Sequence, residues 1–317
     1  TIRKTYNQKE KSHILNANLM TILTEVCRRA SLSYCYTLFI DPGVSNFSEL
    51  PECYSRSFTL LNSFVSQPGS LLVNILTFVV IIIILFSIKN KYTAVGRSEI
   101  CFLFYNFLIF IVISIIVDNG FIGKSSENYS LFLSLQMASI SVCSATLALT
   151  GLLNLKLWED NTWFSMAAFQ LGSIAVGSSS FICHYQTFKK DKMGFLNAKM
   201  TTILLTDYFI NAVFIAMYVI CQCLTSIFIV KNYWMIGAQA LGLMFFLTGQ
   251  IITHFFSSAI CQQSNHYIDG MFAMTLSNLL SFMMVYKSWA ISTAEDLEFG
   301  VNMISEDKTL DQASDKI

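Results

Sequence analysis

The chain alternates between long apolar stretches and short polar connections. Seven stretches carry no charged residue in their interiors except Asp207, which lies near one end of the fifth. They cover residues 70–88, 100–117, 131–153, 162–183, 203–230, 234–260 and 270–286. A helix of about 20 apolar residues crosses a hydrocarbon core of about 30 Å. The pattern therefore predicts an all-α membrane protein, a bundle of seven transmembrane helices.

The composition agrees with a protein surrounded by lipid. Of the 317 residues, 54% are hydrophobic and 13% are charged, and the formal net charge is zero. Little of the surface is then suited to water, so the lipid bilayer is the main solvent. The Lys and Arg residues are dispersed and form no basic stripe, so nucleic acid is not an expected partner.

Four segments follow from the pattern. Residues 1–19 form a polar extension that we expect to be disordered, and residues 20–69 form a segment that contains cysteines. Residues 70–289 hold the seven predicted helices, and residues 290–317 form an acidic tail. A polar, acidic composition favours a disordered appendage over a folded domain.

Basic residues beside the first stretch indicate the orientation of the bundle. Lys89, Lys91 and Arg97 follow this stretch, whereas Arg56 is the only basic residue near its start. The positive-inside rule then places the N-terminus in the lumen and the C-terminus in the cytosol. The fourth connection, with four lysines, is lumenal in this topology and disagrees with the rule. We keep the assignment because the first helix usually dominates orientation.

Sequons and cysteines fit a lumenal N-terminal segment. Asn46 and Asn128 each begin an Asn-x-Ser sequon on the predicted lumenal side and are candidate glycosylation sites. Four of the nine cysteines also fall on that side: Cys27, Cys35, Cys53 and Cys261. Four thiols in an oxidising compartment predict two disulfides, and all three pairings remain open.

Polar side chains inside the apolar stretches allow two interpretations. Asp207 and Asn211 are four residues apart in the fifth stretch, and Gln250 and His254 are four apart in the sixth. Each pair therefore shares a helix face. If the faces meet, they can form the mid-membrane polar site of a receptor-like or transporter-like bundle. The alternative is that these groups only hydrogen-bond one helix to another.

Motifs for catalysis do not occur. The four histidines lie at different levels of the chain, and neither HExxH, GxSxG, a Walker loop nor CxxC is present. We predict no catalytic residues, no cofactor and no metal site. An integral-membrane enzyme with an unusual site remains a second alternative.

Short segments between the apolar stretches carry a family resemblance. Residues Cys27 and Cys35 are followed by Cys53-Tyr-Ser-Arg, and six further segments then occur in order. These are KYTAVGRSE at 91–99, LWEDNT at 157–162, YVICQ at 218–222, HYIDG at 266–270, MMVYKSW at 283–289 and AEDLEFGV at 294–301. From Met20 to Val301 the chain resembles the fungal chitin synthase export chaperone family.

This resemblance implies a role without catalysis. It implies an endoplasmic reticulum membrane protein that helps a chitin synthase fold, prevents its aggregation and lets it enter export vesicles. The resemblance also implies a client that is a polytopic glycosyltransferase making cell-wall chitin, which the chaperone could accompany to later compartments. Residues 1–19 and the tail after Val301 lie outside the resemblance.

Charged residues outside the membrane give two further predictions. Two cytosolic connections carry opposite charges and a tryptophan: Lys91, Arg97, Glu99, Trp158, Glu159 and Asp160. A Lys or Arg paired with Glu159 or Asp160 is expected to hold the two connections together, and the alternative is a docking site. In the tail, Asp296 and Glu298 have an acid-x-acid form, a candidate export signal for vesicle coat proteins. The alternative for the tail is a solvated acidic segment without a partner.

Overall fold

The computed structural model describes residues 23–39, 51–60, 63–91, 94–124, 126–156, 162–189 and 201–294. The first four long helices are α3 (Pro68–Asn90), α4 (Arg97–Asp118), α5 (Glu127–Asn154) and α6 (Trp163–Phe188). The fifth contains η1 (Leu204–Ile210), α8 (Asn211–Leu224) and η2 (Thr225–Val230). The sixth contains α9 (Tyr233–Ile251), η3 (Ile252–Phe256) and α10 (Ser257–Gln263), and α11 (Gly270–Ser292) follows.

Six helices are long and apolar enough to cross a membrane. They are Pro68–Asn90, Arg97–Asp118, Asn128–Asn154, Trp163–Phe188, Thr201–Val230 and Tyr233–Gln263. The prediction of an all-helical bundle is therefore confirmed, and six of its seven stretches have the length and composition of a span. The seventh, α11, has 23 residues but is not among these six, and its side chains include Asn278, Ser281 and Lys287.

The helix ends follow from local sequence. Pro68 stands in the first turn of α3, where a missing N–H costs nothing. Thr162 and Asp269 cap α6 and α11, because their side chains accept hydrogen bonds from the backbone N–H groups of Ser165 and Phe272. Lys231 adopts a left-handed conformation with φ of 54°, which ends the fifth helix and turns the chain into α9.

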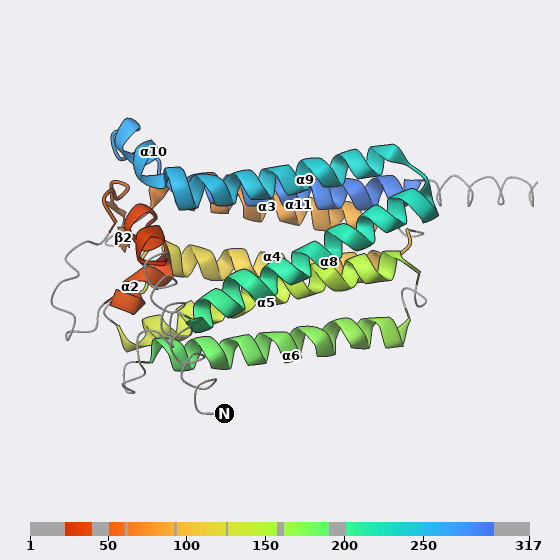
Figure 1. Ribbon diagram of the computed structural model, residues 1–317, viewed down its shortest axis with the longest axis horizontal. Coiled ribbons are helices and arrows are strands. Elements are labelled where there is room, and N and C mark those ends of the chain that lie inside the picture. The colour runs from red at the N-terminus through yellow and green to blue at the C-terminus, as the bar shows by residue number, and fades with distance from the viewer. Residues whose placement is uncertain are drawn as a thin grey trace, which may run out of the picture.

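The helices form two groups (Figure 1). On one side α11 packs between α9 and α3, and on the other α5 packs against α4, α6 and α8. The pair α3 and α4 joins the groups. Aromatic rings fill the junction, where Phe107 stacks on Phe282 with ring centroids 3.6 Å apart and Phe104 meets Tyr286 edge-on.

Glycines allow close approach between neighbouring helices. A Cβ atom at Gly249 of α9 would lie 2.6 Å from Ser277 Cβ of α11, and one at Gly177 of α6 would lie 2.9 Å from Val142 of α5. Neither helix pair could keep its spacing with a larger residue there. Gly249 and Gly177 therefore pack inside the bundle, as is usual for small residues of helices in lipid.

A small cap covers one end of the bundle, which we call the cap end. It contains a helical turn at residues 23–29, α2 (Ser33–Phe39), the antiparallel hairpin β1 (Phe58–Leu60) and β2 (Ser63–Val65), and α10. Two disulfides hold it: Cys27 to Cys35 and Cys53 to Cys261. Their Cα atoms lie 5.6 and 6.0 Å apart, within the usual range for a disulfide.

Candidate functional site

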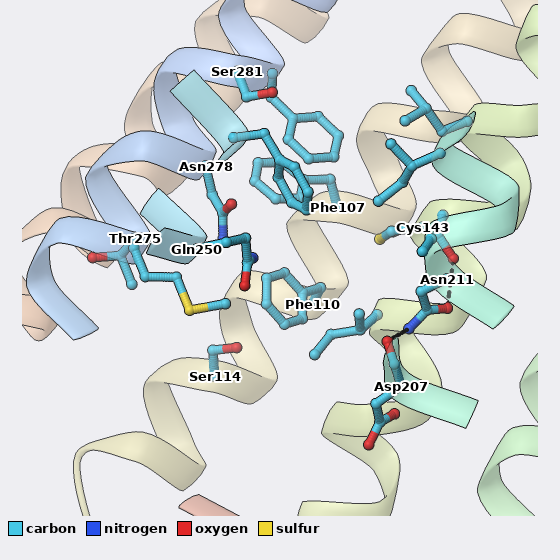
Figure 2. A pocket seen from close by; sticks show the side chains of 18 of the residues that line it. Phe107, Phe110, Ser114, Cys143, Asp207, Asn211, Gln250, Thr275, Asn278 and Ser281 are labelled. Atoms are coloured by element: carbon cyan, nitrogen blue, oxygen red, sulfur yellow. Dashed lines mark hydrogen bonds between the residues drawn. The ribbon is translucent and has the colours of Figure 1, made fainter. Parts of the chain in front are cut away.

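A central cavity of about 560 Å³ lies between the two groups of helices. Its walls come from α3, α4, α5, η1, α8, α9, η3 and α11, with two α2 residues at the cap end. Asp207, Asn211, Gln250 and His254 all line it, and Figure 2 shows three of them around the space. The two predicted polar helix faces therefore line one cavity, although their side chains make different contacts.

Asp207 and Asn211 belong to a paired cluster. Asn211 Nδ2 donates to the Asp207 backbone oxygen at 3.0 Å, and Asn211 Oδ1 accepts from Ser144 Oγ at 2.8 Å (Figure 2). The Asp207 carboxylate lies 3.0 Å from His184 Nε2 of α6, a buried ring. These contacts tie the fifth helix to α5 and α6. For this pair the structure favours helix-to-helix hydrogen bonding.

His254 takes part in a second chain of contacts that reaches the cap. Its Nε2 lies 2.9 Å from the hydroxyl of Tyr208, and that hydroxyl lies 2.7 Å from the hydroxyl of Tyr34 on α2. His254 Nδ1 lies 2.8 Å from the Gln250 backbone oxygen. This series of contacts links α2, η1 and η3. Both Tyr208 and His254 sit in π-helical segments, whose widened turns are frequent at functional sites.

Three carboxamides around the cavity are unpaired. Asn74 of α3 is 1% exposed, and neither its Oδ1 nor its Nδ2 has a hydrogen-bond partner within the described ranges. The side chains of Gln250 and Asn278 likewise make no hydrogen bond to the part of the chain that the structure describes. Figure 2 shows Gln250 and Asn278 reaching into the space. Buried polar groups are usually paired, so Asn74 calls for an explanation, while Gln250 and Asn278 are only partly buried.

Sequence reasoning missed several of these residues. Asn74 is the only carboxamide in the apolar stretch 70–88, a signal that was available. His184 had no predicted role, yet it is buried against Asp207. Tyr34 and Tyr208 carried no motif, because only the fold brings residues 174 positions apart within hydrogen-bond distance.

The cap gathers the four cysteines that the sequence placed on one side. Beside the Cys53–Cys261 bond, His266 Nδ1 lies 3.2 Å from Cys53 Sγ. The three residues are close enough to surround an ion, but a disulfide leaves no thiolate to bind one. Ser31 also bonds Asp269, and Ser33 bonds Asp118, so the cap is fastened to α4 and α11.

The predicted loop contacts lie at the opposite end and are only partly described. The ammonium of Lys91 lies over the ring of Trp289, whose Nε1 donates to Val95 O, while buried Glu99 accepts from Ser165 Oγ at 2.7 Å. Thus Lys91 and Glu99 contact α11 and α6. Trp158, Glu159 and Asp160 lie outside the described residues.

The remaining candidates are on the surface or beyond the described ranges. Asn128 is exposed at the start of α5, at the cap end, so its sequon is accessible. Asn46 falls outside the described residues, as do Asp296 and Glu298 of the acidic tail. Arg97 lies in the first turn of α4.

Comparison with known proteins gives one consistent family. A family model described as chitin synthase export chaperone matches residues 20–303. Curated proteins of that name are similar to the chain: 39% identical in Saccharomyces cerevisiae, over 83% of this chain and 84% of the relative. The one from Candida albicans is 35% identical over 89% and 91%, and that from Aspergillus oryzae 33% over 88% and 84%. No solved structure matches significantly.

Proposed function

Since this chain belongs to the chitin synthase export chaperone family, we propose that it is a membrane-embedded chaperone for folding and export of a chitin synthase from the endoplasmic reticulum. The observation that carries this proposal is the match along residues 20–303, which includes every described element. Relatives from distant fungi carry the same name over more than four fifths of their length. The role supports cell-wall chitin synthesis and needs no catalysis, cofactor or metal of its own.

We further propose a multi-pass protein with seven spans, a lumenal N-terminus and a cytosolic C-terminus. Six helices meet the criteria of length and hydropathy, and α11 is long enough and packs between α9 and α3. The two disulfides at the cap end fit an oxidising lumen. Glycosylation of Asn128 would support this orientation and is detected as a mobility shift on enzymatic deglycosylation. If Asn128 were cytosolic, it would stay unmodified and no shift would occur.

The chitin synthase is the proposed client, and the tail is the proposed contact with vesicle coats. A polytopic client offers lipid-facing helices and loops, which a chaperone surrounded by lipid can meet in the membrane plane. Asp296 and Glu298 provide the acidic pair that basic pockets of coat proteins accept. Accompanying its client to later compartments would follow from that contact.

The proposal is tested by removing the gene from a fungus whose wall contains chitin. We expect one chitin synthase to stay in the endoplasmic reticulum, while an unrelated plasma-membrane protein reaches the surface normally. Affinity isolation in mild detergent should recover that synthase with the chaperone. Normal delivery of every chitin synthase in the deletion strain would overturn the proposal. Rescue with Asp296→Ala and Glu298→Ala together tests the tail, since unchanged export would leave it a solvated segment.

A further inference from the structure

We propose that the central cavity binds one molecule of a neutral lipid that carries a hydroxyl group, the feature that sterols and diacylglycerols share. The site is built from Asn74, whose carboxamide is buried and unpaired, from the partly buried carboxamides of Gln250 and Asn278, and from the apolar wall beyond them. This ligand site goes beyond the chaperone role. It would remain a property of the chain even if the client were a different protein.

The cavity changes from polar to apolar along its length. Asn74, Ser114, Gln136 and Gln250 lie toward the cap end. With a rise of about 1.5 Å per residue, they stand within a few helical turns of it. Toward the other end the lining side chains are mainly apolar: Leu147, Ile215, Val219, Leu243, Phe246 and Val285. Gln239 is a polar exception there, and its Nε2 donates to Gln222 and Ser288. A molecule with a polar group at one end and a hydrocarbon body matches this gradient.

The unpaired carboxamides select a group that both donates and accepts hydrogen bonds. Each carboxamide has two N–H donors and one oxygen acceptor. Burying such a group without partners is costly, and Asn74 is almost completely buried. A hydroxyl group can accept from one carboxamide and donate to another. Binding a lipid hydroxyl would therefore satisfy groups that the described chain leaves without partners.

Charge around the cavity argues against an anionic head group. Among the lining residues that the structure describes there is no Lys or Arg, whereas Asp118 and Asp207 are present. Asp118 is already engaged by Ser33 and Gln136, and Asp207 by His184. A phosphate group would meet two carboxylates and no cation to pair with. The lining therefore favours an uncharged ligand.

Size and access both suit a ligand from the bilayer. A volume of about 560 Å³ lies within the range of small-molecule sites. Ile251 and Phe255 line the cavity, yet they are also 49% and 62% exposed, so the cavity reaches the outer surface beside η3. From the turn that joins them, α8 and α9 diverge toward the cap end (Figure 1). The exposed side chains of Ile251 and Phe255 would let a lipid reach the cavity from the bilayer.

The test uses the purified full chain in detergent. Saturable binding is measured for a tritiated sterol, a tritiated diacylglycerol and tritiated phosphatidylserine, and we expect one of the first two to bind. The double variant Gln250→Leu and Asn278→Leu should bind it roughly tenfold more weakly, because hydrogen bonds to the hydroxyl are lost. The matched control Gln170→Leu changes an exposed glutamine of α6 outside the cavity and should bind like the wild type.

A second measurement does not depend on the variants. A photoreactive analogue of the bound lipid should label peptides of α9 and α11, and unlabelled lipid should compete. The double variant replaces unpaired polar groups, so its ligand-free thermal unfolding should be unchanged or higher. The proposal is overturned if only phosphatidylserine binds, if no lipid binds saturably because the cavity holds water alone, or if labelling maps to the outer face of α6.

Discussion

Two sets of polar side chains line the same cavity and behave in opposite ways. Asn211 bonds Ser144 of α5, and the Asp207 carboxylate lies 3.0 Å from His184 Nε2 of α6, its one close partner among the described residues. Asn74 of α3 is buried without a side-chain partner in the described structure. Asn278 of α11 is partly buried, and no hydrogen bond of its side chain to the described residues is seen. The paired set lies within one group of helices. The unpaired set belongs to the other, across the cavity.

The difference separates two uses of polarity inside a membrane protein. A polar group that finds a partner on a neighbouring helix holds the two helices together, typically with a modest free energy. A polar group that faces a space without a partner adds nothing to stability and is expensive to keep. Substituting a residue of the first set should therefore lower the stability of the protein. Substituting a residue of the second set should leave that stability unchanged or raise it. Three substitutions test this contrast.

The largest effect is expected for Asp207→Leu. This change leaves the buried ring of His184 without its carboxylate partner and should lower the free energy of unfolding by about 2–3 kcal/mol. The measurement is thermal unfolding in detergent. Gln170→Leu, on the exposed face of α6, serves as the control and should leave Tm unchanged. An unchanged Tm for Asp207→Leu would show that the pair contributes no stability.

A smaller effect is expected for Tyr208→Phe. The change removes only the hydroxyl that connects Tyr34 to His254, at a cost of about 1 kcal/mol. Because this hydroxyl joins the cap to η3, hydrogen exchange of the α2 amides should also become faster. Tyr233→Phe, an exposed tyrosine at the start of α9, is the matched control. Equal exchange rates of the α2 amides in both variants would show that this hydroxyl does not stabilise the cap.

The smallest effect, with the opposite sign, is expected for Asn74→Leu. An apolar side chain of similar size removes two unpaired polar atoms, so the free energy of unfolding should stay equal or rise by up to about 1 kcal/mol. The same thermal unfolding assay applies. A clear drop in Tm would mean that Asn74 has a structural partner, and the contrast between the two sets would no longer hold.

The sequence predicts the helices well because their signal is local. The first stretch, 70–88, lies within α3, and the fifth, 203–230, lies within the helix at Thr201–Val230. An uninterrupted run of apolar residues needs no tertiary information to be recognised. The π-helical segments η1 and η3 have no such signal, because packing rather than composition widens a helical turn.

The cavity is the part that sequence could not supply. Spacing of four residues placed Asp207 with Asn211 and Gln250 with His254, but it could not say that Gln250 lacks a partner while Asn211 has two. That distinction depends on the side chains that other helices bring beside these two residues. Ser144 bonds Asn211, whereas Asn278 lines the cavity with Gln250 without bonding it. Likewise, four cysteines allowed three pairings, and only the fold brings Cys53 beside Cys261.

The bond between Cys53 and Cys261 also makes the order of chain synthesis matter. Its two residues are 208 positions apart, and ribosomes add about 5–20 residues per second, an interval on the order of 10–40 s. Throughout this interval the sulfur of Cys53 must wait, as a thiol or in a temporary bond with Cys27 or Cys35. Closure thus comes only after the sixth helix has been made. The finished bond marks a newly made chain whose membrane insertion is nearly complete.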